Sequence, residues 1–471
     1  MFKKAVSMIL TIALVILALT VPAFAESAPP ELSAEGVLLI DLTTGEVLYE
    51  KDPDKQLYPA STTKMMTALL VMENLNLNTT LKADADVAST GGTRLGMKAG
   101  EQISAKDALY EMLIGSCNDL AVLLAKAVAG TVEDFAVMMN EKAKEIGCTN
   151  THFVNPSGLH DDDHYTTAND LALIAVYCMK KPEFREIVKR STYTYVRGKG
   201  ADNPGATETM SSSNWLLNDT SHYMYVGDTR RTPKYDGCIG IKTGWTSQAK
   251  GCLVGAATKN GTTLMSVVLK SNGSTNGSYE RFIDSIKLLD WGFANYRTYQ
   301  AASMGKEMGT IAVRNGEFNN VRAVLSTDVY TTLTTLQKDS EVTTQVRLDN
   351  SVTAPFDQGT PCGKMDVFVD GQKVGEYDII TASAMKKGGI LSVFGIEDAT
   401  AKKIFAAALI ILVVAIVVFI VNLAMRKVKS DKQRASKAAE VKARREELER
   451  KHAAEEELER FAAEHSRRSD N

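Results

Sequence analysis

Two side chains near the start of the chain could together perform nucleophilic catalysis. Ser61 precedes Lys64 by three residues, and residues three apart on a helix share one face, so the amine can reach the hydroxyl. A serine hydroxyl is a poor nucleophile until a base removes its proton. Lysine can be that base when burial and a nearby cation lower its pKa from about 10.4. We therefore take Ser61 as the candidate nucleophile and Lys64 as the candidate base.

A second motif, residues 116–118, falls at a predicted break between two helical runs. The Ser116 hydroxyl could relay a proton toward a leaving amine, and the Asn118 side chain could hold a substrate amide. The motif would supply a proton path and an amide-binding group to a reaction at Ser61. The Ser61 amide, at a helix N-terminus, also suits an oxyanion hole.

A third motif, Lys242, Thr243 and Gly244, closes a predicted strand. Lys242 and Thr243 offer donors to an anionic end of a substrate, and the Lys242 charge would lower the pKa of a nearby Lys64. Gly244 would let a substrate backbone lie close to the strand. Each motif alone is common, but the three in this order are specific.

Other catalytic arrangements have little support in this sequence. No GxSxG segment occurs, so the nucleophile elbow of α/β-hydrolases is not predicted. The six histidines never form HExxH, so the zinc-binding helix of a metallopeptidase is not predicted either. His152, His160 and His164 stand in a loop-like stretch. The carboxylates at 161–163 could form a metal loop, but a solvated turn is the favoured interpretation. We expect no metal and no other cofactor.

Hydrophobic periodicity predicts the elements that must position these motifs. Strands are expected at 36–41, 46–50, 237–242, 252–257 and 263–270. Helices are expected at 60–73, 106–130, 132–146, 167–180 and 278–293. Strands at both ends with helices between them predict an α+β layer arrangement, and we assign residues 30–295 to this domain.

A Val- and Thr-rich region begins near Tyr296. Short alternating runs occur at 309–313, 321–325, 342–348, 364–369 and 373–380. They predict a small all-β domain of five to seven strands over residues 297–385. The region carries no clustered catalytic residues, so we expect it to be a spacer or an interaction module.

Two apolar segments indicate export and membrane anchoring. Residues 1–25 combine two lysines, an apolar run and a small-x-small site at 23–25, which is typical of a cleaved secretory signal rather than an uncleaved anchor. Residues 404–425 carry no charge, and as a helix they extend about 33 Å, enough to cross a hydrocarbon core of about 30 Å. Basic residues follow at once, so the positive-inside rule predicts a single-pass cell-membrane protein with residues 26–403 outside.

The cytoplasmic tail, residues 426–471, is rich in Ala, Glu, Lys and Arg and predicts a solvated charged helix. Its apolar positions are too sparse for a sustained coiled-coil seam. A helix without a fixed partner is favoured, and a docking helix for an unknown cytoplasmic or membrane-surface partner is the alternative.

The formal net charge of −3 averages over unlike segments. The tail holds 14 basic and 11 acidic residues, whereas residues 26–425 hold 38 basic and 46 acidic ones. This acidic excess excludes a strongly basic nucleic-acid-binding function for the exported part.

Six cysteines remain after removal of the signal segment, an even number that permits disulfides in an exported protein. Their wide, irregular spacing argues against a disulfide scaffold, and a chain of this size needs none. Cys238 and Cys252 flank a predicted hairpin and could face each other across it. Free buried thiols are the favoured alternative.

The wider context of the motifs resembles the serine penicillin-recognising enzymes, and among them the low-molecular-mass D-alanyl-D-alanine carboxypeptidases. The matching segments are YPASTTKMMT at 58–67, GSCND at 115–119, NPSGLH at 155–160 and DGCIGIKTGW at 236–245. The resemblance covers residues 30–295 densely and continues more loosely through the β-rich domain, which that family also carries.

This resemblance implies a fold and a division of roles. The fold would be a β-lactamase/DD-peptidase-like sheet with a helical layer. Ser61 would form an acyl-enzyme as the terminal D-alanine leaves a peptidoglycan stem peptide, and water would release the shortened peptide. The backbone N–H groups of Ser61 and Trp245 would form the oxyanion hole, and Thr243 would bind the terminal carboxylate. β-Lactams would acylate Ser61 as substrate mimics.

Two features depart from the family pattern. Cys117 stands where the family often has a smaller residue such as Gly, which could tune the pocket while leaving Ser116 and Asn118 intact. The predicted anchor is a full span with a tail, where many relatives have an amphipathic helix. Arg281 could help to bind a carboxylate, but a surface helix residue is the favoured interpretation.

Two alternative functions remain beside the carboxypeptidase. A β-lactamase needs a second carboxylate to activate the deacylating water, and no Glu-x-x-x-Asn element occurs between the second and third motifs. A non-catalytic membrane scaffold that only binds wall peptides would not need the intact set of Ser61, Lys64, Ser116 and Lys242.

Overall fold

The computed structural model describes residues 28–272 and 279–466 and contains two compact units. The first comprises the residues up to Lys306 together with Thr327–Val346 and Met365–Tyr377. The second comprises Glu307–Ser326, Arg347–Lys364 and the residues from Asp378 onward. The predicted signal segment, residues 1–25, lies outside the described residues.

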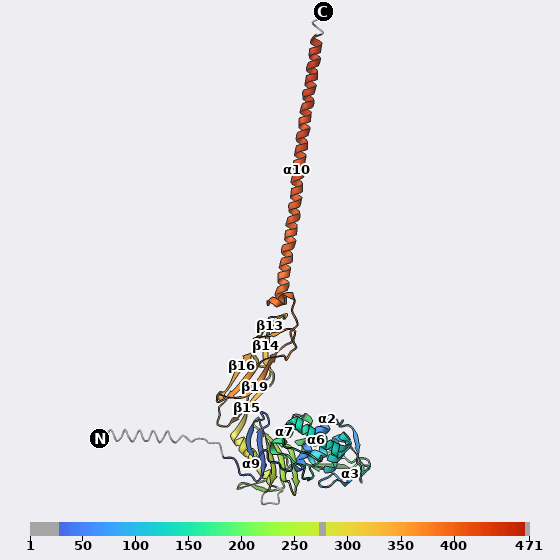
Figure 1. The fold of residues 1–471 in the computed structure, drawn as a ribbon, viewed down its shortest axis with the longest axis vertical. Coiled ribbons are helices and arrows are strands. Elements are labelled where there is room, and N and C mark those ends of the chain that lie inside the picture. The colour runs from blue at the N-terminus through green and yellow to red at the C-terminus, as the bar shows by residue number, and fades with distance from the viewer. Residues whose placement is uncertain (1–27, 273–278, 467–471) are drawn as a thin grey trace, which may run out of the picture. The chain divides into compact units, whose positions relative to one another are not determined.

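A five-stranded antiparallel sheet forms the centre of the first unit (Figure 1). In sheet order its strands are β2 (Val47–Lys51), β1 (Gly36–Asp41), β11 (Thr262–Ser271), β10 (Lys250–Lys259) and β9 (Cys238–Thr246). The N-terminal hairpin therefore lies beside strands that come far later in the chain, with Gly36 opposite Leu269. β9, which carries the third motif, is an edge strand, so one side of its backbone is unpaired within the sheet.

Both faces of this sheet are buried. In β1, Val37 and Leu39 pack in the core beneath α9 (Glu280–Asn295), whereas Leu38 and Ile40 pack in the core of the helical layer on the opposite face. Successive side chains of a strand point to opposite faces, so burial on both sides explains the uninterrupted apolar run of β1. The predicted α+β layer arrangement is confirmed.

The helical layer follows the predicted 3.6-residue pattern, with one interruption. Its main elements are η1 (Ala60–Thr63), α2 (Lys64–Asn74), α4 (Ala105–Ile114), α5 (Asn118–Ala129), α6 (Val132–Ile146) and α7 (Ala168–Met179). The run predicted at 106–130 is two helices, because Ser116 has a left-handed φ of +65° that no helix continues through. The predicted break at the second motif is therefore present.

Short elements escaped the sequence analysis. They are α3 (Ala85–Ser89), α8 (Pro182–Val188) and three ribbons, β3 (Thr80–Lys82) with β4 (Gln102–Ser104), β5 (Thr192–Val196) with β6 (Thr207–Ser211), and β7 (Met224–Val226) with β8 (Thr229–Arg231). Strands of three to five residues show too few alternations for periodicity to reveal them.

Eight strands follow between Tyr296 and Thr381, against the five to seven predicted. They are β12 (Tyr296–Ala302), β13 (Glu307–Arg314), β14 (Asn320–Leu325), β15 (Val329–Thr334), β16 (Val342–Leu348), β17 (Ser351–Thr353), β18 (Pro361–Val369) and β19 (Gln372–Thr381). In the first unit β12 pairs with β15, and in the second unit β14 pairs with β13 and with the end of β19. The all-β character of this region is confirmed.

A single helix, α10 (Asp398–Ser466), ends the described chain (Figure 1). Its most apolar window has a mean hydropathy of 3.5, and no part of that window is buried in the protein. The helix is long and apolar enough to cross a membrane, which suggests membrane anchoring. Beyond residue 425 it is charged and carries i,i+4 ion pairs such as Lys451–Glu447 at 3.3 Å, so the described part of the tail, residues 426–466, is helical as predicted.

All six cysteines are free. In the β9–β10 ladder Cys238 lies opposite Ala257 and Cys252 lies opposite Gly244, so the two thiols do not face each other. The predicted hairpin is present, but its register rules out the cross-strand disulfide. The favoured interpretation, free thiols, is confirmed.

Candidate active site

Ser61 lies in the 3₁₀ turn η1, which continues directly into α2. Ala60, just before it, has a φ of +47°. Gly158 packs so closely on this turn that a Cβ there would lie 1.8 Å from the Ala60 carbonyl oxygen. The NPSG segment therefore fixes the turn that carries the candidate nucleophile, and Ser61 itself stays partly exposed.

Lys64 is fully buried, and its amine contacts three oxygen atoms. Nζ lies 2.9 Å from Ser61 Oγ, 2.7 Å from Asn118 Oδ1 and 2.7 Å from the Ser157 carbonyl oxygen. The last two oxygens can only accept, and the Asn118 amide is oriented by its own donation to the Gly91 carbonyl at 2.8 Å. A neutral amine would donate its two hydrogens to these acceptors and direct its lone pair at the Ser61 hydroxyl.

The electrostatics of the site favour a neutral Lys64. Burial is the largest cause that lowers the Lys64 pKa well below its usual value, and the charge of Lys242 lowers it further. Burial also lowers the pKa of Lys242, to about 7. A desolvated lysine next to a second cation is available as a base near neutral pH.

Ser116 and Lys242 form a second hydrogen-bonded pair in the same site. Lys242 Nζ donates to Ser116 Oγ at 2.9 Å and to the Thr243 carbonyl oxygen at 3.1 Å. A positive φ at a serine is uncommon and persists where the surrounding structure holds it. Here the break between α4 and α5 aims Ser116 at β9, so the structure brings all three motifs together.

The remaining residues of the third motif line the end of β9. Thr243 Oγ1 lies 2.8 Å from Ser213 Oγ. A Cβ on Gly244 would lie 2.9 Å from both the Pro59 carbonyl oxygen and the Ser61 nitrogen. Gly244 is thus required for the close approach of β9 to η1, a reason within the fold that the sequence analysis missed. Trp245 follows with a side chain that is 51% exposed.

Several supporting residues were not foreseen from sequence. Asp119 is buried and accepts the backbone N–H groups of residues 95–97 at 2.8–3.1 Å, which orders the loop that contacts Asn118. His164 Nδ1 accepts the Val154 N–H at 3.1 Å, so its Nε2–H faces Thr63 Oγ1 at 2.8 Å. Burial lowers the His164 pKa to about 4. The imidazole is therefore a neutral support behind η1.

The structure modifies the favoured interpretation of Arg281 as a surface helix residue, because the side chain is half-buried and its guanidinium lies 4.6 Å from the centre of the Phe282 ring. Its Nε atom is buried and has no hydrogen-bond partner among the described residues. Burial lowers the pKa of its guanidinium to about 10, and its charge contributes to the lowered pKa of Lys242. The alternative role of Arg281, a carboxylate-binding cation, stays a prediction. In contrast, residues 161–163 form an exposed turn, as favoured, with the Asp163 N–H bonded to Asp161 Oδ1 at 2.9 Å.

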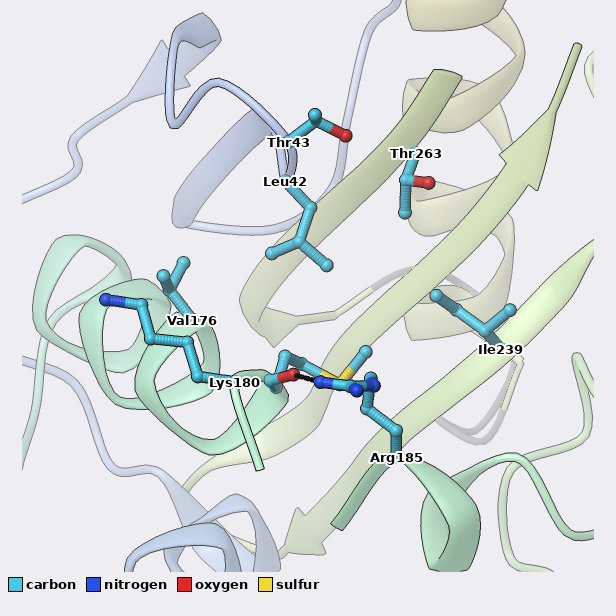
Figure 2. Close-up of a pocket in the computed structure, with 8 residues that line it drawn as sticks. Leu42, Thr43, Val176, Lys180, Arg185, Ile239 and Thr263 are labelled. Carbon is cyan, nitrogen blue, oxygen red and sulfur yellow. Dashed lines mark hydrogen bonds between the residues drawn. The ribbon is translucent and has the colours of Figure 1, made fainter. Parts of the chain in front are cut away.

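A separate cavity of about 300 Å³ lies elsewhere in the first unit (Figure 2). Leu42, Val176 and Ile239 supply apolar parts of its lining, and Arg185 closes one side by donating to the Met179 carbonyl at 2.6 Å. None of the motif residues lines this cavity. The group around Ser61 therefore remains the candidate active site.

Two family models match the chain. Residues 23–273 match peptidase S11, D-alanyl-D-alanine carboxypeptidase, and residues 296–387 match the C-terminal domain of penicillin-binding protein 5. The first match contains all three motifs. The second covers the β-rich region that follows α9.

Individual relatives agree with these matches. The chain is 30% identical over 366 residues to the D-alanyl-D-alanine carboxypeptidase DacF of Bacillus subtilis, which covers 76% of this chain and 87% of that protein. It is 32% identical to a D-alanyl-D-alanine carboxypeptidase of Streptomyces sp. K15, over 56% of this chain and 89% of that protein. The solved structure of penicillin binding protein 5 from Haemophilus influenzae superposes with a TM-score of 0.62 at 28% identity, covering 76% of this chain and 99% of that one. The chain therefore belongs to peptidase S11, the family of serine-type D-alanyl-D-alanine carboxypeptidases among the low-molecular-mass penicillin-binding proteins.

Proposed function

We propose that this carboxypeptidase cleaves the terminal D-alanyl-D-alanine bond of peptidoglycan stem peptides through an acyl-enzyme on Ser61. The observation that carries the proposal is the buried Lys64 amine, 2.9 Å from Ser61 Oγ and hydrogen-bonded to two oxygens that can only accept. Ser61 Oγ attacks the carbonyl carbon while Lys64 Nζ takes its proton. The C–N bond then breaks, and the leaving D-alanine amine takes a proton through Ser116.

The other site residues are assigned to substrate binding. The Ser61 and Trp245 N–H groups stabilise the oxyanion, and Asn118 holds a substrate amide. Lys242 and Thr243 bind the terminal carboxylate. Arg281, whose buried Nε has no hydrogen-bond partner among the described residues, contributes a further positive charge. Because β9 is an edge strand, its free side can pair with an extended peptide as an added strand. Water then hydrolyses the Ser61 ester, which restores the hydroxyl and releases the shortened peptide.

The direct test combines product analysis with intact-mass measurement. Incubation with a stem pentapeptide should release D-alanine, and penicillin should add one adduct to the wild-type chain. Ser61→Ala should abolish both, whereas Ser89→Ala, which changes an exposed serine on α3, should change neither. Lack of D-alanine release by the wild type, or an adduct that persists in Ser61→Ala, would contradict the mechanism.

The same experiment separates the alternatives. Hydrolysed penicillin that appears as fast as D-alanine would favour a β-lactamase. Penicillin binding without any peptide turnover would favour a wall-binding scaffold. Transfer of the acyl group to an added amine would change the reaction to transpeptidation and leave the assignment of Ser61 in place.

We also propose a topology and domain boundaries. Residues 1–25 are a cleaved signal, 30–295 the catalytic domain, 297–385 the β-rich domain, 404–425 the membrane span and 426–471 the cytoplasmic tail. Basic residues directly after the apolar segment support this orientation. In intact cells stripped of wall, an added protease should digest the catalytic domain and leave an epitope on the tail protected. The reverse pattern would overturn the orientation.

A further inference from the structure

The segment just before α10 exposes large apolar side chains in the second unit. In the 3₁₀ turn η3 (Ile390–Phe394), Ile390, Val393 and Phe394 are 87%, 67% and 78% exposed. Phe318, in the turn between β13 and β14, is 54% exposed. Its neighbour Asn319 donates to the Gly395 carbonyl at 2.8 Å, which brings that turn beside η3. We call these four side chains the apolar collar.

The apolar collar stands on a frame of hydrogen bonds that includes the start of α10. The Gly389 N–H donates to Asp398 Oδ1 at 2.8 Å, and the Asp398 N–H donates to the Glu317 carbonyl at 3.2 Å. The Asn319 N–H donates to Glu397 Oε1 at 3.2 Å. These bonds join the β13–β14 turn, η3 and the first turn of α10 into one structure. The collar therefore has a fixed relation to the beginning of the helix.

The apolar collar lies at interfacial depth when 404–425 spans a bilayer. Ile404 follows Asp398 by six helical steps, a rise of about 9 Å. The headgroup region adds roughly 5–7 Å on each side of the hydrocarbon core. Asp398, which is bonded to the collar through Gly389, is thus expected at or just beyond the outer edge of the headgroups. Large apolar side chains that extend from this level toward the bilayer would enter the interfacial region, where surface-bound segments bury their apolar groups.

Charge in the same segments favours an anionic lipid surface. Lys386 and Lys387 precede η3, Lys402 and Lys403 lie in the first turns of α10, and all four are exposed. The nearby acids Glu397 and Asp398 are engaged in the internal hydrogen bonds of the frame. Lysine suits this position because its apolar stem can lie in the interface while its charge meets lipid phosphates.

We propose that the apolar collar inserts into the outer-leaflet interface of an anionic phospholipid membrane, with these lysines on the headgroups. The proposal rests on the membrane span proposed above and adds a second contact with the same bilayer. A large exposed apolar surface needs a partner, and the continuity of the collar with the span selects lipid. The second unit would then rest on the membrane surface instead of swinging freely above it.

Depth-dependent fluorescence tests this contact in the full chain. Phe394→Trp is reconstituted in vesicles of phosphatidylglycerol and phosphatidylethanolamine, and the emission of the wild type with its three tryptophans is subtracted. We expect a blue-shifted signal that lipids brominated at shallow acyl positions quench at least twofold. Val374→Trp, at a position on β19 that is 50% exposed, is the matched control and should stay solvent-like and unquenched. Solvent-like emission from Phe394→Trp would overturn the proposal.

A third reporter separates this inference from the proposed span. Leu412→Trp lies near the middle of 404–425 and should be quenched by deeply brominated lipids. If Leu412→Trp is quenched and Phe394→Trp is not, the span stands and the collar contact is wrong. If neither is quenched, the span itself fails. Protection of Phe394→Trp from aqueous iodide without quenching by bromolipids would identify a protein contact and overturn the assignment to lipid.

Discussion

The Ser61 site and the apolar collar depart from the usual partition of side chains in opposite ways. At the site, Lys64 and Lys242 are buried, and each amine is hydrogen-bonded to oxygen atoms. At the collar, Ile390 and Phe394 lie on the surface with most of their area exposed. Buried polar groups persist when they are bonded, and large apolar groups persist on a surface when a partner covers them. The site is thus complete within the chain, whereas the collar is completed by something outside it.

Removal of the Lys64 amine from the buried site should have the largest effect, a loss of acylation at Ser61. Lys64→Met preserves much of the side-chain volume but removes the base, so the rate of penicillin acylation should fall by roughly 10³-fold or more. Time-resolved intact-mass analysis measures this rate. The melting temperature must be followed as well, because Asn118 and the Ser157 carbonyl lose a donor. Near-normal acylation of Lys64→Met would show that another group activates Ser61. Lys98→Met, at an exposed position, is the control and should be acylated at the wild-type rate.

Charges introduced into the exposed apolar part of α10 should have the next largest effect, a loss of membrane attachment. Ile411→Asp combined with Val414→Asp places two carboxylates in the proposed span, each disfavouring insertion by about 2.5–3.5 kcal/mol. The chain should move from the membrane pellet to the soluble fraction after an alkaline wash. Ile411→Leu with Val414→Leu should remain in the pellet. Full retention of the double Asp variant would mean that 404–425 is not what anchors the chain.

Glu111 is one of the buried polar groups that break the pattern, since neither of its carboxyl oxygens has a hydrogen-bond partner among the described residues. Burial, with smaller contributions from Asp107 and Glu208, raises its pKa to about 8. The folded state then keeps a proton that the unfolded state releases near pH 4.5. The contribution of Glu111 to the free energy of unfolding is therefore greatest below pH 4.5 and falls as the pH rises toward 8. The loss from this group between pH 5 and 8 should be on the order of 3 kcal/mol.

Glu111→Gln isolates that contribution, because a neutral amide has no proton to lose. Thermal unfolding followed by near-ultraviolet circular dichroism should show a smaller decline in melting temperature between pH 5 and 8 than in the wild type. Glu141→Gln, on the exposed side of α6, should keep the wild-type decline. Equal slopes in Glu111→Gln and the wild type would show that Glu111 is ionised in the folded chain.

Local patterns explain what could be predicted from sequence. The bounds of β1 and α6 are those expected. β1 is a short apolar run before a turn, and α6 begins after the capping residue Thr131 and ends just before Gly147, which has a φ of +103°. The types and order of the residues in the three motifs were sufficient to single them out, and the structure brings them together. Signals of this kind are contained within a few consecutive residues.

What the sequence could not reveal depends on contacts between distant segments. His164 supports Thr63 across 101 positions, and Ser213 meets Thr243 across 30. The possible Cys238–Cys252 disulfide is excluded by the register of the β9–β10 ladder, and no pattern within a single strand specifies that register. Arg281 was taken as a surface residue because charged residues are rarely enclosed, and only the packed fold shows that its Nε is buried.

The smallest expected effect tests whether the bonding of the buried site is as complete as its distances suggest. Ser213→Ala removes the hydroxyl 2.8 Å from Thr243 Oγ1, a hydrogen bond worth about 1 kcal/mol. Since Thr243 is proposed to hold the terminal carboxylate in both ground and transition states, KM for a pentapeptide should rise about fivefold with little change in kcat. Ser213→Thr keeps a hydroxyl and should restore KM.

A substrate with a C-terminal amide gives this prediction its control. Without a carboxylate to bind, wild type and Ser213→Ala should hydrolyse it with similar kcat/KM. If Ser213→Ala instead lowers kcat equally for both substrates, the hydroxyl acts on the arrangement of β9 and not on the anion. In that case the Ser213 hydroxyl would resemble the oxygens around Lys64, because it would maintain the internal order of the site and not the contact with the substrate.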